Sequence, residues 1–116
     1  MTQLHPTGDE LVEMLAALSN PLRVRIIATL AGGRDYVSHV AREIGVSRPL
    51  VHIHLQRLEA VGLITGSLEL SQDGKAMKYY EVTDFALLLT PQTLADSAET
   101  LTIPDTYKGP ARKEHP

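Results

Sequence analysis

The sequence predicts a mostly helical α+β domain. Apolar residues recur at helical spacing through most of residues 9–62, a pattern typical of packed helices. A segment of alternating apolar and polar residues with an Asp-Gly turn signal follows over residues 64–83, which is typical of a β-hairpin. These two patterns indicate that the helices come first and the hairpin after them.

The composition fits one soluble domain. The 116 residues are 43% hydrophobic and 22% charged, close to the average for globular domains. The lack of cysteine excludes disulfides, thiolate metal sites and cysteine nucleophiles. No apolar run approaches the ~20 residues of a transmembrane helix, and the N-terminus has no secretion-signal pattern, so we expect a cytoplasmic protein. The net charge of −3 is unevenly spread, with acidic flanks and a mildly basic middle over residues 20–82.

The first two helices have clear start and stop signals. Residues 9–18 carry apolar side chains at i, i+3, i+4 and i+7, with acidic residues in the first turn, where the helix dipole favours them. The second helix is expected to begin at Asn20-Pro21, because Asn is a good N-cap and Pro suits the first helical position. Gly32-Gly33 ends it.

Residues 36–62 predict two helices joined by a short turn. The third helix runs from about Tyr36 to Ile44 and is closed by Gly45. The fourth starts with Ser47 as N-cap, and Gly62 follows it. Val51, Leu55 and Leu58 are expected to form the buried stripe of this helix, so the pair is a helix-turn-helix candidate.

The hairpin is predicted from Asp73-Gly74 as the two central turn residues. That turn places Gln72 opposite Lys75, Leu70 opposite Met77 and Glu69 opposite Lys78, which pairs apolar with apolar residues and opposite charges with each other.

The C-terminal third is less regular. Residues 85–89 fit either a strand or a helix, and Thr90-Pro91 predicts the start of a helix that continues to about Leu101. Residues 104–116 contain three prolines and mixed charges and are expected to be a disordered tail, and residues 1–8 a flexible N-terminus. The folded domain is therefore expected to span residues 9–103.

Three helices followed by a two-stranded wing form a winged helix-turn-helix, with a helix on either flank. The spans LSNPLRVRIIATL, VAREIGVSRPLVHIHLQRLEAVGLI and GKAMKYYEV resemble the ArsR/SmtB group of bacterial and archaeal repressors. The resemblance covers about residues 11–83, and its most specific part is the run from Ser47 to Ile64. It implies a transcriptional repressor that binds double-stranded operator DNA as a homodimer.

The fourth helix is the candidate DNA reader. With its apolar stripe facing inward, a step of about 100° per residue directs the intervening side chains outward. The expected DNA-binding residues are Ser47, Arg48, Pro49, His52, Ile53, Gln56 and, at the wing tip, Lys75. In the resembling family the positions of Arg48, Pro49, His52 and Ile53 read bases, and this chain departs from the usual residues at all four, so its operator sequence is expected to be its own. The alternative is a solvated helix face.

Several other polar residues have structural interpretations. His54 lies beside the apolar stripe and is expected to be a hydrogen-bonded structural histidine. Arg23 and Arg25 are candidates for contacts with the DNA backbone, with a structural role equally open for Arg23. Lys78 is assigned to a cross-strand pair with Glu69 rather than to DNA.

A homodimer is expected to form through the first and last helices. Both carry more apolar surface than a small winged core can cover. The candidate interface residues are Leu11, Met14, Leu15, Leu18, Leu94, Ala98 and Leu101.

Metal, cofactor and enzyme functions are not supported. The family's cysteine site at the start of the third helix is matched by Tyr36 and Ser38, and residues 83–103 hold no histidine for its second site. No glycine-rich phosphate loop or catalytic triad spacing occurs, so the protein is not expected to be an enzyme. The remaining alternative is a winged-helix protein-interaction module without DNA binding, which the mild charge and the apolar Pro49 and Ile53 keep open.

Overall fold

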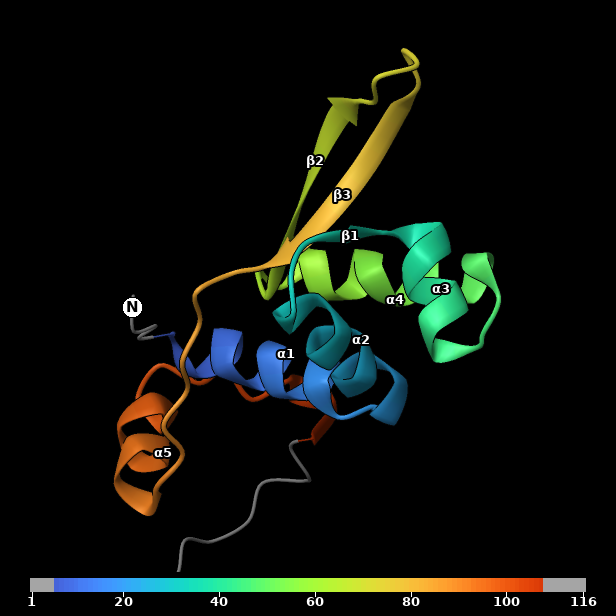
Figure 1. Ribbon diagram of the computed structural model, residues 1–116. Coiled ribbons are helices and arrows are strands. Elements are labelled where there is room, and N and C mark those ends of the chain that lie inside the picture. Colours follow the sequence, from blue (N-terminus) through green and yellow to red (C-terminus); the bar gives the residue numbers. More distant parts are fainter. Residues whose placement is uncertain (1–5, 108–116) are drawn as a thin grey trace, which may run out of the picture.

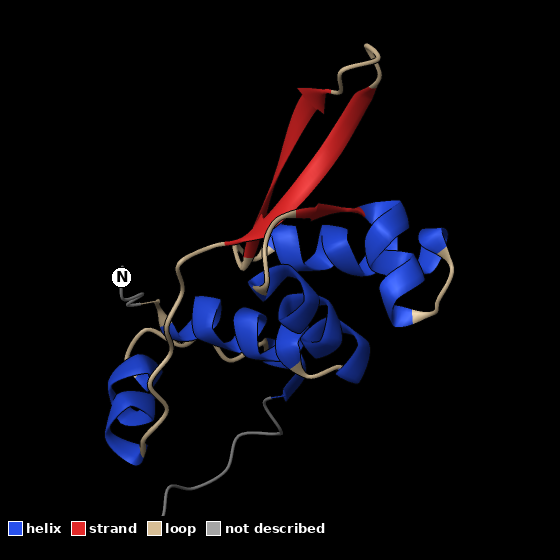
Figure 2. Cartoon of the chain, viewed as in Figure 1, coloured by secondary structure: helices blue, strands red, loops and turns tan. Residues whose placement is uncertain are grey.

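The computed structural model describes residues 6–107. The chain folds into helices at its two ends and a hairpin that projects beyond them (Figures 1 and 2). The elements are α1 (Gly8–Leu18), α2 (Pro21–Ala31), β1 (Asp35–Tyr36), α3 (Val37–Ile44), α4 (Arg48–Ala60), β2 (Ile64–Leu70), β3 (Ala76–Val82), α5 (Pro91–Ala98) and the 3₁₀ turn η1 (Asp105–Tyr107). Residues 1–5 and 108–116, which make up most of the expected flexible ends, lie outside the described residues.

Local capping sets where the first helices begin. Thr7 and Glu10 form a reciprocal capping box, in which Thr7 Oγ1 accepts from the Glu10 amide and Glu10 Oε1 accepts from the Thr7 amide. The first helix therefore begins at Gly8, one residue earlier than predicted. Asn20 Oδ1 accepts from the amides of Leu22 and Arg23, which confirms Asn20-Pro21 as the start of α2.

The helix-turn-helix forms as predicted. Gly45 ends α3 in the left-handed region at φ 85°, a conformation that costs glycine little. Ser47 Oγ then accepts from the Leu50 amide at 3.3 Å and caps α4. Val51, Leu55 and Leu58 are fully buried, which confirms the inward stripe of α4 and leaves the opposite face outside.

The sheet has three strands in the order β1-β3-β2, all antiparallel. The sequence predicted only two. The extra strand is Asp35–Tyr36, which pairs with Tyr80 and Tyr79 at the edge of β3. A strand of two residues has too few positions for an alternating pattern, so its pairing with β3 is evident only in the fold.

The predicted hairpin register is wrong by one residue. Leu70 pairs with Ala76, Glu69 with Met77 and Leu68 with Lys78. The loop has three residues, Gln72 to Gly74, and the Ser71 amide donates to the Lys75 carbonyl at 2.7 Å across it. Gly74, at φ 83°, takes the left-handed position that ends a three-residue loop instead of being the second residue of a two-residue turn.

The core lies between the helices and the base of the wing. Its buried members come from every element from α1 to β3 except β1: Met14, Ala17, Ile26, Leu30, Val40, Ala41, Val51, Leu55, Leu58, Leu63, Ile64 and Tyr80. Because Ile64 and Tyr80 belong to the wing strands, the base of the wing is continuous with the helical core. The outer half of the wing extends past that core (Figure 1).

The C-terminal part differs from both predicted alternatives. Residues 85–89 form neither a strand nor a helix, and α5 ends at Ala98, three residues before the predicted end. The segment after α5 lies against the start of α1 instead. There the Gly8 amide donates to Thr100 Oγ1 and the Thr102 amide donates to Asp9 Oδ1, both at 2.7 Å. We call this pair of hydrogen bonds the terminal latch.

Within residues 6–107, no single helix is long and apolar enough to cross a bilayer. The consecutive helices α1 and α2 satisfy length and hydropathy only when taken together, and they are bent by 92°.

Candidate nucleic-acid interface

The outward face of α4 carries the predicted reading residues together. Arg48, Pro49, His52, Ile53 and Gln56 are all exposed. Ile53 is 59% exposed, which is high for a side chain of its size in the middle of a helix. This face therefore combines cationic, amide and apolar groups on one rigid element.

The polar groups of this face are unused inside the protomer. Among residues 6–107, the side chains of Arg48, His52 and Gln56 make no hydrogen bond or ion pair. Ser47 accepts the Leu50 amide, and its hydroxyl proton stays available to a further acceptor. Side chains held on a helix without internal partners are suited to bind an external ligand.

His54 has the structural role expected of it, and Arg23 supplies the partner. Arg23 Nε donates to His54 Nδ1 at 3.0 Å, and Arg23 Nη1 donates to the Ala17 carbonyl at 3.2 Å. One guanidinium thus ties the end of α1 to α4. Burial lowers the pKa of His54, and the Arg23 charge lowers it further, so the imidazole stays neutral and accepts the hydrogen bond.

The wing is braced on both of its faces. On one face Lys78 Nζ lies 3.5 Å from Glu59 Oε1 of α4 and 5.1 Å from the centre of the Tyr80 ring. The predicted partner of Lys78 was Glu69, which is wrong, because the register places Met77 opposite Glu69. Gly66 makes room for this bridge, since a Cβ there would lie 2.5 Å from Lys78 Cε.

Arg34 provides the brace on the other face, and sequence reasoning missed it. Its guanidinium pairs with Glu69 and lies 4.6 Å from the centre of the Tyr79 ring. The hydrogen bond from Arg34 lowers the pKa of Glu69. An arginine just after Gly32-Gly33 is the only sequence signal, and it does not indicate a strand partner 35 residues away.

Lys75 lies at the wing tip, as predicted. Its side chain is exposed, and within the described part of the chain its ammonium has no ion-pair partner. The neighbouring Asp73 is engaged locally, since its carboxylate accepts from the Ser71 hydroxyl and the Lys75 amide. Those hydrogen bonds lower the pKa of Asp73.

The candidate dimer residues fall into two groups. Leu11 and Met14 are buried inside the protomer, so little of their surface remains for a partner. Leu15, Leu18 and Leu101 are half-buried, and Leu94 and Ala98 are exposed. Val12 is also exposed on α1.

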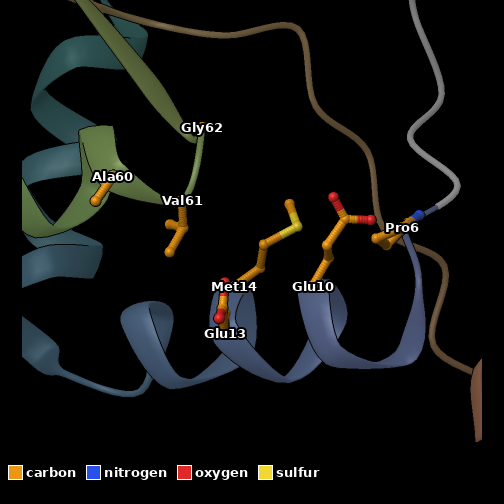
Figure 3. Close-up of a pocket in the computed structure, with 7 residues that line it drawn as sticks. All are labelled: Pro6, Glu10, Glu13, Met14, Ala60, Val61 and Gly62. Carbon is orange, nitrogen blue, oxygen red and sulfur yellow. The ribbon is translucent and has the colours of Figure 1, made fainter. Parts of the chain in front are cut away.

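An open groove of about 350 Å³ lies between α1 and the end of α4 (Figure 3). Met14 and Val61 provide apolar walls, and Glu10 and Glu13 an acidic rim.

On α3, His39 contacts Asp35 and lies 3.4 Å from Glu43 Oε1. In residues 6–107 no group of three or more histidine or acidic side chains is arranged to hold a metal ion.

Comparison with known proteins identifies the family. The model of the arsR family of bacterial regulatory proteins matches residues 20–65, from the cap of α2 to the start of β2. An uncharacterised helix-turn-helix-type transcriptional regulator of Methanocaldococcus jannaschii is 36% identical over 76 residues, which are 66% of this chain and 79% of that protein. The transcriptional repressor SmtB of Mycobacterium tuberculosis is 36% identical over 58 residues, which are 50% of this chain and 43% of that protein.

Solved structures agree on the fold. A homodimeric winged helix-turn-helix DNA-binding domain from Mycobacterium bovis superposes with a TM-score of 0.58 at 23% identity, covering 78% of this chain and 74% of that chain. The transcriptional repressor BigR of Xylella fastidiosa superposes with a TM-score of 0.56 at 20% identity, covering 89% and 91%. Taken with the capped helix pair and the braced wing, these matches show that the chain belongs to the arsR family of helix-turn-helix transcriptional regulators.

Proposed function

We propose that the protein represses transcription by binding a pseudo-palindromic operator as a homodimer. The observation that carries this proposal is the exposed face of α4, on which Arg48, His52 and Gln56 have no internal partners in the described residues. A second helix of this motif enters the major groove with its N-terminal residues against base edges.

Each side chain of the face has a distinct role in this proposal. The Arg48 guanidinium donates to O6 and N7 of a guanine, and the Gln56 amide pairs with an adenine. Pro49 and Ile53 contact thymine methyl groups. His52 lies on the same face of α4 and offers a polar ring to the base edges. Ser47 and the amides at the start of α4 hold a phosphate, which sets the register without reading sequence.

The dimer places two such helices on one face of the DNA. Helices α1 and α5, which carry the exposed apolar residues Val12 and Leu94, lie away from the wing tip (Figure 1). A two-fold axis through this side leaves both copies of α4 free. Half-sites of this kind are about 34–36 Å apart from centre to centre, so the operator is expected to repeat after one helical turn.

Selection of bound sequences from a random DNA pool tests the proposal. A regulator with several phosphate contacts enriches a pseudo-palindrome, and its affinity for that sequence falls steeply between 50 and 200 mM salt, by about 10³-fold or more. If no sequence is enriched and DNA binding is weak at low salt, α4 is instead a protein-docking face, an alternative that the exposed Ile53 favours.

A further inference from the structure

The groove between α1 and the end of α4 combines apolar walls with negative charge. Its volume of about 350 Å³ lies within the range of small-molecule sites, about 300–1,000 Å³. Its described lining includes Met14 and Val61 as apolar surface, two carboxylates, and no lysine or arginine. Glu10 and Met14 extend into it from the same side of α1 (Figure 3). Such a space suits a ligand that has an apolar body and a positive charge.

The two carboxylates of the groove are free to bind a cation. Glu10 Oε1 accepts from the Thr7 amide at 2.9 Å, which holds the side chain in place. In the described part of the chain, Glu10 Oε2 and the carboxylate of Glu13 make no hydrogen bond or ion pair. Residues 1–19 contain no lysine or arginine, and the guanidinium of Arg23 is engaged in its bridge to α4. Both negative charges therefore remain available to an external partner.

The backbone at the end of α4 favours the same sign of ligand. The amides of Val61 and Gly62 both donate to the Glu59 carbonyl, so this wall offers no free donor to an anion at those positions. The C-terminal end of a helix also carries a partial negative charge. Arg57, in the last turn of α4, is not among the residues that line the groove. Both walls of the groove thus attract a cation.

The proposed dimer leaves this groove open. Glu10, Glu13 and Met14 are spaced i, i+3 and i+4, so they share one face of α1. Val12, on the proposed dimer surface, is about 150° around the helix from the centre of that face. A partner protomer held at Val12 therefore contacts the other side of α1, and a small molecule can still enter the groove.

We propose that this groove is an effector site for a small organic amine. The protonated amino group lies between Glu10 and Glu13, and the apolar body packs on Met14 and Val61. The proposal rests on the proposed operator binding, because an effector acts by changing that affinity. Helices α1 and α4 form the opposite walls and are joined by the Arg23 bridge, so a ligand that spreads them displaces the reading helix and lowers operator affinity.

Binding is tested on the protein without DNA. The probe is 2-phenylethylamine, which is protonated at neutral pH, and 2-phenylethanol has the same apolar body without the charge. Nuclear magnetic resonance titrations follow the amides of Val61 and Gly62. The amine is expected to shift both signals saturably with a Kd of about 1 mM, and the alcohol is not. Equal shifts with both compounds, or no saturable shift with the amine, overturn the proposal.

A charge-removing variant locates the site. Glu10→Gln with Glu13→Gln keeps the capping box, because a glutamine oxygen can still accept from the Thr7 amide. Amine binding is expected to weaken about tenfold. Glu81→Gln with Glu99→Gln makes the same change of charge at exposed residues outside the groove and is expected to bind the amine as the parent protein does. A groove variant that retains the parent affinity for the amine overturns the assignment.

The operator complex tests the effector role. Saturating amine is expected to lower the operator affinity of the parent protein at least about threefold relative to sodium chloride of equal ionic strength, and to have no such effect on the groove variant. Amine binding with unchanged operator affinity overturns the effector role. Groove amides that shift on dilution and do not respond to the amine show that a second copy fills the groove, which also overturns it. A parent protein that binds no operator overturns the proposed function, whereas the titration without DNA still reports on the groove.

Discussion

Arg48 is expected to contribute to discrimination between DNA sequences and not only to general affinity for DNA. It lies in the first turn of α4 with its guanidinium unpaired in the described structure. Arg48→Ala is expected to cost about 1–3 kcal/mol on the preferred operator and to relax selectivity at one or two base pairs. Binding titrations against the operator and against scrambled DNA measure both effects.

Lys75→Ala is the companion to that variant. A lysine that contacts only phosphate should weaken all sequences alike and reduce the salt slope by about one unit. If Arg48→Ala instead weakens the operator and the scrambled DNA equally, the reading face is assigned wrongly.

His54 should make the fold sensitive to mild acid. Its pKa is lowered in the folded state by burial and by Arg23, so the unfolded chain binds the proton more readily. The stabilisation is therefore complete above the unfolded pKa of about 6.5 and is lost as the pH falls from there toward the folded value. The melting temperature of the protein is therefore expected to decrease as the pH is lowered from 7.5 to 5.

The variant His54→Gln supplies the control for that titration. Its amide oxygen can still accept from Arg23 Nε, and it does not titrate. The pH dependence of its melting temperature should be shallower than that of the parent protein, and an identical slope would assign the effect to other groups.

At the scale of elements, the lack of a side chain at Gly8 allows the end of α5 and the segment after it to pack against α1. A Cβ at Gly8 would lie 2.2 Å from the Ser97 carbonyl oxygen and 3.1 Å from Leu101 Cα, both backbone atoms that cannot rotate away. Gly8→Ala is expected to destabilise the protein by about 1–3 kcal/mol, more than the gain of up to about 1 kcal/mol in helix propensity. Urea unfolding of this variant measures the difference.

Gly32→Ala is the matched change. Gly32 also borders a helix, its φ is −78°, and the nearest atom to an added Cβ is 3.6 Å away. Its free energy of unfolding should stay within about 0.5 kcal/mol of the parent protein. Equal destabilisation by both substitutions would show that the contact with α5 is not the cause.

How well a structural feature could be predicted from the sequence depends on how far apart the interacting residues lie along the chain. Asn20, Ser47 and Thr90 cap helices through atoms a few residues away, so their positions were predictable from neighbouring residues. The wing register failed because Asp73-Gly74 fits two loop lengths that differ by one residue. The Arg34 brace and the terminal latch join residues far apart in sequence, and no local pattern announces such contacts.

At the scale of the whole molecule, dimerisation should depend on α1 and α5 and be independent of the reading face. Val12→Asp with Leu94→Asp places carboxylates on the exposed apolar surface of both helices and is expected to shift the protein to monomers. Sedimentation velocity at micromolar concentration detects the change. Ile53→Asp, on α4, should lose operator affinity and remain dimeric, and a parent protein that sediments only as a monomer would contradict the assembly.

Metal ions that prefer sulfur or nitrogen ligands are not expected to release the protein from its operator. The chain has no cysteine, and residues 6–107 contain no group of three or more histidine or acidic side chains arranged for a metal. Zinc, nickel, cadmium and arsenite, each titrated into the DNA complex, should leave binding unchanged at low micromolar concentration. Release at a stoichiometric ratio of any of these would contradict the expectation.

The terminal latch also governs a local opening of the fold. The Gly8 and Thr102 amides are hydrogen-bonded across the same contact, although almost the whole fold separates them along the chain. One detachment of the segment after α5 exposes both, so these two amides should show the same protection factor against deuterium exchange, lower than those of the core helices. The Thr102 hydrogen bonds lower the pKa of Asp9, so the protection factors of both amides should fall together once acid protonates that carboxylate.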